Sequence, residues 1–213
     1  MAKYLTEFIG TFFLVLSISL AVSTGQPLAG LAIGGTLMVM IYMGGHISGA
    51  HYNPAVTVAV FLRGAMPASD IVPYMGAQIL GGTIAAVVGG VITGNTEVIA
   101  PSADYGVAAW LLVEILYTFA LATVVLNVAT VNKTGVSNNS YYGLAIGFTV
   151  VAAAIAGGGI SGGAYNPAVG IGLTLGDLFS GGNTIANVWL YIVGPLIGGG
   201  LAGVVFKIMN ADQ

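Results

Sequence analysis

Two asparagine side chains occur in sequence contexts that suit binding of a small polar molecule. Asn53 and Asn166 each begin an Asn-Pro-Ala tripeptide in an otherwise apolar region, and each follows a short stretch rich in glycine and serine. A side-chain amide donates and accepts hydrogen bonds without carrying a charge. If the fold brings the two amides together, they suit a small neutral solute that forms hydrogen bonds.

Two carboxylates and a histidine are the other candidates for chemistry. Glu7 and Glu114 each interrupt an apolar segment, and His51 stands two residues before Asn53. A carboxylate is expensive in lipid, so each is either functional, for instance as a proton relay, or bound to partners that hold it. The remaining histidine, His46, has no second histidine or carboxylate at the spacing of metal ligands. We therefore predict no metal site, no catalytic residue and no cofactor.

The composition of the chain indicates which solvent surrounds these residues. Of its 213 residues, 57% are hydrophobic and only 5% are charged, and the mean hydropathy is +0.97. Soluble domains carry roughly 25% charged residues, so most of this surface must face a lipid bilayer. Four lysines and arginines with a net charge of −3 exclude a nucleic-acid surface. The absence of cysteine excludes disulfides and thiolate metal sites.

Six apolar segments are long enough to cross a membrane. At about 1.5 Å per residue, a helix formed by each would span a hydrocarbon core of roughly 30 Å. The predicted spans are residues 4–24, 28–45, 71–94, 107–131, 141–158 and 185–209.

Two further apolar segments, 53–63 and 166–176, are too short to cross. A helix of that length measures about 16 Å, close to half the membrane. Asparagine is favoured as a helix N-cap and proline at the first helical position, so Asn-Pro-Ala predicts a helix start in both places. We expect two re-entrant half-helices.

The order of the segments requires an inverted repeat. The offset of 113 positions that relates Asn53 to Asn166 also brings residues 30–34 onto residues 143–147. Each copy has three spans, and an odd number of crossings makes the second copy enter from the opposite face. The half-helices then dip from opposite sides, and their Asn-Pro-Ala ends meet near the midplane. There, the positive ends of two helix dipoles repel cations.

The few charged residues predict the orientation. The basic residues all fall on one side of this topology: Lys3, Arg63, Lys133 and Lys207. By the positive-inside rule this side, with both termini, is cytoplasmic, and the protein is a multi-pass protein of the cell membrane. The other face carries Glu97, Asp104 and Asp177.

Residues 45–57, which read Gly-His-Ile-Ser-Gly-Ala-His-Tyr-Asn-Pro-Ala-Val-Thr, resemble the first signature loop of the aquaporin and glycerol-facilitator (major intrinsic protein) family. Residues 7–12 resemble the first helix of that family, and Glu114 stands at the matching place in the fourth span. Residues 77–82 and 194–199 resemble the third and sixth helices. The resemblance therefore covers essentially the whole chain.

The resemblance implies a fold, an assembly and several residue roles. The implied fold is an all-α membrane protein, an aquaporin-like right-handed bundle of six transmembrane helices plus two re-entrant half-helices. It is a single channel domain over residues 1–213, with repeat one at about 1–96 and repeat two at about 105–213. The implied assembly is a homotetramer in the lipid bilayer, in which every monomer has its own pore. Asn53 and Asn166 would lie at the pore centre, and the loop-supporting residues would be Glu7, Glu114 and His51.

The chain departs from the family directly after its second Asn-Pro-Ala, where Val169 replaces the usual arginine. The other constriction positions, carried over by spacing, are Ile33, Ala154 and Gly163. All four are apolar, which predicts a wide, apolar constriction. Arginine supplies a fixed charge and several donors, so its loss lowers the barrier to cations and removes the orienting contact for polyols. We expect the wide pore to pass water and a broad range of small neutral solutes such as glycerol, ammonia or urea. Alternatively, Tyr52 or Tyr165 swings to refill the gap, or a different residue narrows the pore.

Two readings from other classes compete with a passive channel. An ion-coupled secondary transporter also uses inverted repeats and broken helices at the midplane. Beyond Glu7 and Glu114, however, the spans hold no group that binds a coupling ion by charge. A membrane enzyme would need a nucleophile and a base, and no such pair is evident.

Overall fold

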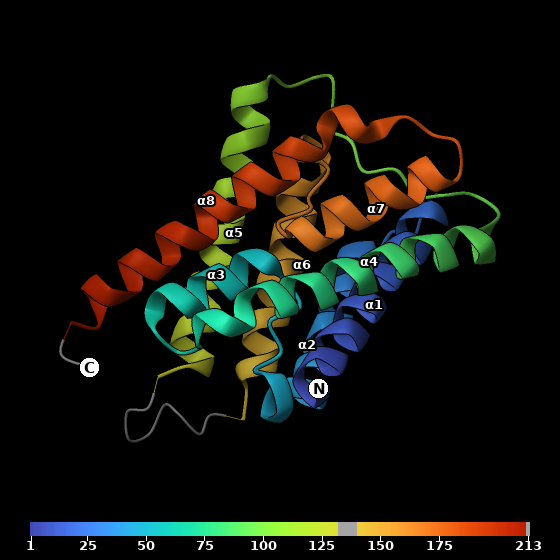
Figure 1. Ribbon diagram of the computed structural model, residues 1–213. Coiled ribbons are helices and arrows are strands. Elements are labelled where there is room, and N and C mark those ends of the chain that lie inside the picture. The colour runs from blue at the N-terminus through green and yellow to red at the C-terminus, as the bar shows by residue number, and fades with distance from the viewer. Residues whose placement is uncertain (132–139, 212–213) are drawn as a thin grey trace.

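The computed structural model describes residues 1–131 and 140–211, and Lys133 lies outside these described residues. Within them the fold is all-helical and contains no strand (Figure 1). The elements are α1 (Ala2–Ser23), α2 (Ala29–Ser48), α3 (Pro54–Arg63), η1 (Ala68–Asp70), α4 (Ile71–Thr93), α5 (Val107–Ala129), α6 (Tyr142–Ser161), α7 (Pro167–Phe179), η2 (Thr184–Asn187) and α8 (Val188–Met209).

The six predicted spans are confirmed as α1, α2, α4, α5, α6 and α8, each long and apolar enough to cross a membrane. The predicted ends of two spans were wrong, because α2 continues to Ser48 and α6 to Ser161. Both helices end where the next residue is a glycine in the left-handed region, with φ of 85° at Gly49 and 91° at Gly162. That conformation is inexpensive only for glycine, so these glycines fix where the helices end.

The two half-length helices begin as predicted. Asn53 caps α3 by accepting a hydrogen bond from the Ala55 backbone N–H, with Oδ1 and N 2.8 Å apart, and Asn166 caps α7 through the Ala168 N–H at 2.9 Å. A proline follows each cap. Helix α3 has 10 residues and α7 has 13, so α7 extends three residues beyond the predicted end at 176.

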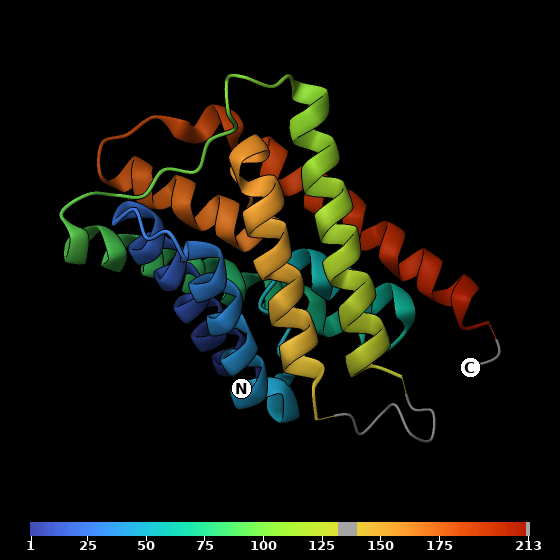
Figure 2. The ribbon, with the colours of Figure 1, turned by 180° about the vertical axis from the view of Figure 1, so that it is seen from behind.

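Each half-helix packs against the last helix of the other half of the chain. Helix α3 lies on α8 and α7 lies on α4, while α1 packs on α4, α5 on α8 and α2 on α6 (Figures 1 and 2). These contacts require glycine, because a Cβ on Gly199 of α8 would lie 2.3 Å from the Ala55 carbonyl oxygen. Likewise, a Cβ on Gly82 of α4 would lie 2.6 Å from the Ala168 carbonyl oxygen. Small residues therefore let each half-helix start lie directly on the opposite helix backbone.

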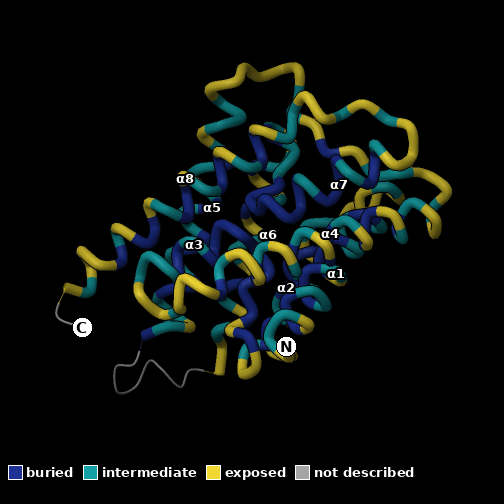
Figure 3. The backbone as a smooth tube through the Cα atoms, in the orientation of Figure 1, coloured by how far each residue is buried: buried dark blue, intermediate teal, exposed yellow. Residues whose placement is uncertain are grey.

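The distribution of polarity is that of a protein in lipid. Large apolar side chains such as Val91, Phe148 and Ile155 are exposed on the outside of the long helices. Glu7 and Glu114, by contrast, are fully buried. Figure 3 shows that the buried parts of the chain, in dark blue, are concentrated in the middle of the bundle. Buried charged groups need hydrogen-bond partners, and the positions of these partners define the candidate site.

Candidate functional site

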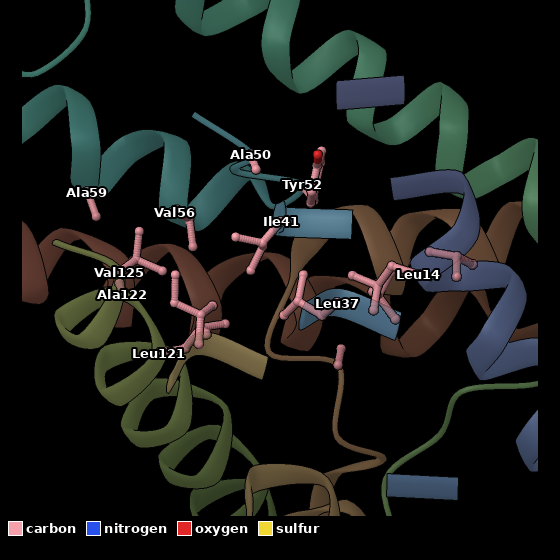
Figure 4. Packing of buried hydrophobic residues seen from close by; sticks show 14 of the residues in the cluster. Leu14, Leu37, Ile41, Ala50, Tyr52, Val56, Ala59, Leu121, Ala122 and Val125 are labelled. Atoms are coloured by element: carbon pink, nitrogen blue, oxygen red, sulfur yellow. The ribbon is translucent and has the colours of Figure 1, made fainter. Parts of the chain in front are cut away.

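A cavity of ≈ 370 Å³ runs past the starts of both half-helices. Asn53 and Asn166 line it together, although they stand 113 positions apart in the sequence. Much of its wall is aliphatic, and Figure 4 shows four of its residues converging from α2, α3 and α5. These are Leu37, Ile41, Val56 and Leu121.

The two asparagines are held by reciprocal hydrogen bonds between the halves of the chain. The Asn53 Nδ2 donates to the Tyr165 carbonyl oxygen at 2.9 Å, and the Asn166 Nδ2 donates to the Tyr52 carbonyl oxygen at 2.8 Å. Each Oδ1 already accepts the capping N–H of its own half-helix. Both amide orientations are thereby fixed, and each NH₂ keeps one further hydrogen for a molecule in the cavity.

The carboxylate of Glu7 holds residues 48–53, the part of the first signature loop that links α2 to α3, and from here on the name first signature loop denotes these residues. It accepts hydrogen bonds from the backbone N–H groups of His51 and Tyr52 at 2.9 and 2.7 Å. The Ser48 hydroxyl and the Gln78 amide also donate to it, both at 2.7 Å. Four donors therefore meet one buried carboxylate, where hydrogen bonds to a charged acceptor are strong.

The carboxylate of Glu114 holds the second signature loop, residues 161–166, in the same way. It accepts from the Ser161 hydroxyl at 2.8 Å and from the N–H groups of Ala164 and Tyr165 at 3.0 and 2.7 Å. Neither Glu114 nor Glu7 lines the cavity. This is the placement that a loop-supporting role requires.

The backbone of both signature loops is strained. Ala50, Tyr52 and Tyr165 have φ of 52°, 50° and 49°, in the left-handed region that residues other than glycine rarely adopt. Such a conformation costs about 1–2 kcal/mol per residue. The hydrogen bonds from the Tyr52 and Tyr165 N–H groups to the two carboxylates stabilise this conformation. The left-handed conformation in turn directs the carbonyl oxygen of each tyrosine toward the asparagine of the opposite loop.

His51 lies at the cavity wall with its ring fixed on one side. Its Nδ1 is 3.1 Å from the Thr57 hydroxyl oxygen, which itself donates to the Asn53 carbonyl and accepts from the Gln78 amide. A threonine hydroxyl has one proton, so His51 must donate from Nδ1 and carry its lone pair on Nε2. The ring is thus part of the network behind the first loop.

The four residues proposed for the constriction all line the cavity: Ile33, Ala154, Gly163 and Val169. None has a polar side chain. The alternative that Tyr52 or Tyr165 swings into the gap has no support in the geometry. Their hydroxyls donate to the Met40 carbonyl at 2.9 Å and to the Ala153 carbonyl at 3.0 Å.

Sequence reasoning missed the contribution of residues 97–100, which also line the cavity. It assigned Glu97 only to the face opposite the basic residues and gave Val98, Ile99 and Ala100 no role. The apolar triplet Val98-Ile99-Ala100 inside that segment was the available signal, and Ile99 is indeed buried. In the described ranges, no group of three histidine, cysteine or acidic side chains is arranged to hold a metal ion.

Several known proteins resemble this chain in sequence or in fold. The sequence model of the family described as "Major intrinsic protein" matches residues 1–206. The chain is 36% identical over 226 residues to the "Glycerol uptake facilitator protein-like 6" of Lactiplantibacillus plantarum, with all of both chains covered. It is 32% identical to the "Aquaporin Z" of Bradyrhizobium diazoefficiens, covering 100% of this chain and 95% of the relative. Among solved structures, the aquaglyceroporin from Plasmodium falciparum superposes with a TM-score of 0.85 at 21% identity, covering 99% of this chain and 97% of that one.

Proposed function

The chain belongs to the major intrinsic protein family, and from that premise we propose that its cavity is a pore for water and small neutral solutes whose constriction is apolar instead of charged. Passive channel function follows from the aquaporin and glycerol-facilitator relatives. The apolar constriction and the roles of single residues are the parts that we propose.

The observation that carries the proposal is the pair of reciprocally bonded asparagines at the cavity wall. Asn53 and Asn166 present amide N–H groups beside the N-termini of α3 and α7. Donors and two positive helix ends favour the oxygen atom of water or of a neutral solute, and they disfavour a cation. We place the pore centre at these two residues.

The breadth of the solute range rests on Ile33, Ala154, Gly163 and Val169. Without arginine, no fixed charge and no fork of donors replaces the hydration of a solute at this point. Exclusion of ions then depends on the central dipoles and on the dehydration of an ion in an apolar neck. Neutral solutes such as glycerol, urea or ammonia carry no net charge, so the central dipoles do not repel them and their dehydration in the neck costs much less than that of an ion.

An ion-coupled transporter is not favoured. A coupling ion or proton would need a carboxylate that the solute path can reach, but Glu7 and Glu114 lie outside the cavity lining. Both are instead occupied by loop donors. We assign these two glutamates and His51 to loop support, and we assign no enzymatic role to the chain.

Orientation, assembly and repeat boundaries complete the proposal. Lys3 pairs with Asp70, and Arg63 donates to the Thr130 carbonyl; Lys3, Asp70 and Thr130 border one shared hollow. We propose that this end, with both termini, is cytoplasmic in the cell membrane. The exposed apolar helix faces suit lipid and three further copies in a homotetramer. The matched loops support repeats at about 1–96 and 105–213.

The constriction is tested by restoring the charge. In proteoliposomes, we expect the protein to conduct water together with glycerol, urea or ammonia. Val169→Arg should lower glycerol and urea flux about tenfold relative to water flux, because the guanidinium both narrows the neck and binds the solute. Val169→Leu is the matched control, which adds bulk without charge and should change the ratio less. Water flux in the wild type without permeation by any of the three solutes would contradict a broad pore.

A further inference from the structure

The segment between α4 and α5 brings a carboxylate to the cavity. Among the described residues that line the cavity, Glu97 is the one acidic side chain. It belongs to the part of the chain that lies at the end of the molecule opposite to both termini (Figure 1). The carboxylate therefore stands at the entrance of the proposed pore, away from the asparagine pair.

This segment is held firmly against the second signature loop. The Ser102 N–H donates to the Ile160 carbonyl oxygen at 3.1 Å, and the Trp110 indole donates to the Ser102 carbonyl at 2.9 Å. A Cβ on Gly162 would lie 2.9 Å from the Ala100 carbonyl oxygen, so the two backbones are in close contact. Ile99 is only 6% exposed. Glu97 is thus fixed in position by its neighbours.

Most of the hydrogen-bonding capacity of Glu97 is open, because an ionised carboxylate has about four acceptor sites and one of them is used. Its Oε2 accepts the Ser23 hydroxyl at 2.8 Å, which orients the carboxylate. In the described part of the chain, its Oε1 has no hydrogen-bond partner and Glu97 forms no ion pair. An ionised carboxylate only accepts hydrogen bonds. A molecule that binds here must supply donors.

We propose that Glu97 is a solute-recognition residue at the outer mouth of the pore, and that it takes small solutes with several N–H donors, such as urea and simple amides. This inference rests on the channel function proposed above. Arginine at the constriction would offer donors to a solute, whereas this mouth offers an acceptor. Urea can place two parallel N–H groups on one carboxylate, and hydrogen bonds to a charged acceptor are about twice as strong as neutral ones.

Protonation of Glu97 should switch this recognition. Partial burial raises the pKa of the Glu97 carboxyl, and the Ser23 hydrogen bond opposes that shift. As the pH falls through this raised pKa, the carboxylate loses its charge, and urea loses its strongest acceptor. Urea itself does not titrate in this range. Among the described residues, the other titratable groups in the cavity wall or at this end include His51, Tyr52, Tyr165, Asp104, Tyr105 and Asp177.

The experiment compares the urea-to-water permeability ratio of full-length variants in proteoliposomes. Glu97→Gln should lower this ratio about threefold or more, because the charged acceptor is lost. Asp104→Asn is the matched control, since Asp104 lies in the same segment but bonds Ser102 and does not line the cavity. Its ratio should stay within about twofold of the wild type. On acidification the ratio should fall in the wild type and in Glu97→Asp, and it should not fall in Glu97→Gln.

The outcomes separate this inference from the channel function itself. A wild type that conducts no water contradicts the channel function. A wild type that conducts water while Glu97→Gln keeps the urea-to-water ratio and its pH profile overturns only the role of Glu97. Equal losses of urea and water flux in Glu97→Gln would mean that the residue supports the segment instead of recognising solute, which also overturns the inference.

Discussion

The signature loops 48–53 and 161–166 have the same strained tyrosine, serine and buried glutamate, but different residues lie behind them. Tyr74 on α4 and Tyr191 on α8 donate to the Ser48 and Ser161 carbonyls at 2.8 and 2.7 Å, so the two helices are matched at these tyrosines. Four residues further along, α4 has Gln78 and α8 has Pro195. Glu7 therefore has a fourth donor that Glu114 lacks.

The difference extends through a whole cluster. Behind the first loop, His51, Thr57 and Gln78 form a hydrogen-bonded group, and the matching residues behind the second loop are Ala164, Gly170 and Pro195. A Cβ on Gly170 would lie 2.2 Å from the Tyr191 Cβ, so packing fills the space there. The same strained loop can thus be fixed by polar contacts on one side and by close packing on the other.

Replacing Glu7 or Glu114 should have the largest effect on water flux and on the unfolding temperature. The size of the loss in each variant shows which of the two loops depends more on its carboxylate. Glu7→Ala leaves four buried donors without their acceptor, and Glu114→Ala leaves three. Each unpaired buried donor costs about 1–3 kcal/mol. We expect both variants to lose water flux and to unfold at a much lower temperature in detergent, Glu7→Ala more so.

The control for this pair is Glu→Gln at each position, which keeps the volume and one acceptor oxygen. These variants should fall between the wild type and the alanine variants in unfolding temperature. Wild-type water flux in either alanine variant would show that the loops do not depend on the carboxylates, and the comparison would lose its basis.

Exchanging the residues that differ should have the next largest effect. Gly170→Thr puts the threonine of the first half into the second, where its Cβ overlaps Tyr191. Overpacking of this kind costs about 1–3 kcal/mol, and more where backbone cannot shift. The unfolding temperature should fall clearly, and Gly170→Ala should share most of the loss because the clash begins at Cβ. An unchanged unfolding temperature in Gly170→Ala would contradict the view that packing replaces the polar cluster.

Local signals sufficed to predict the fold and the meeting point of the asparagines. Asn53 and Asn166 cap helices because an asparagine followed by proline favours a helix start in any context. Six spans followed from apolar length alone. The ends of α2 and α6 could not be placed, because only the left-handed φ of Gly49 and Gly162 fixes them. In a stretch with several glycines, the sequence does not show which glycine adopts a left-handed φ and ends the helix.

The inverted repeat predicted that Asn53 and Asn166 meet, but the other contacts between distant residues were the part that the sequence could not supply. Glu97 reaches the cavity because its segment packs on the second signature loop, a contact that no spacing rule predicts. Similarly, the sequence shows Gln78 and Pro195 at matched places, but it does not show that one bonds a glutamate and the other does not. The roles assigned to the pore-centre and constriction residues stay predictions until flux is measured.

Replacing Gln78 should have the smallest effect, even though this residue bonds both Glu7 and Thr57 behind the first loop. Its Nε2 donates to Glu7 at 2.7 Å and to Thr57 at 3.0 Å, but its Oε1 is buried without a hydrogen-bond partner among the described residues. Gln78→Met removes one hydrogen bond to a carboxylate, worth about 1.5–3 kcal/mol, and one to a hydroxyl, worth about 1 kcal/mol, and it also removes an unsatisfied buried acceptor that costs about 1–3 kcal/mol. The two contributions oppose each other.

We therefore expect Gln78→Met to lower the unfolding temperature only slightly and to leave the water flux close to that of the wild type. Glu7 still accepts the Ser48, His51 and Tyr52 donors, which is the number that Glu114 has in the wild type. Thr57→Val is the comparison variant, because it leaves the His51 Nδ1–H without an acceptor and removes one of the two hydrogen bonds that the Gln78 amide donates, and it should destabilise the protein more. If Gln78→Met were instead the more damaging of the two, the fourth donor would be essential to the first loop, and the two loops would differ in mechanism as well as in composition.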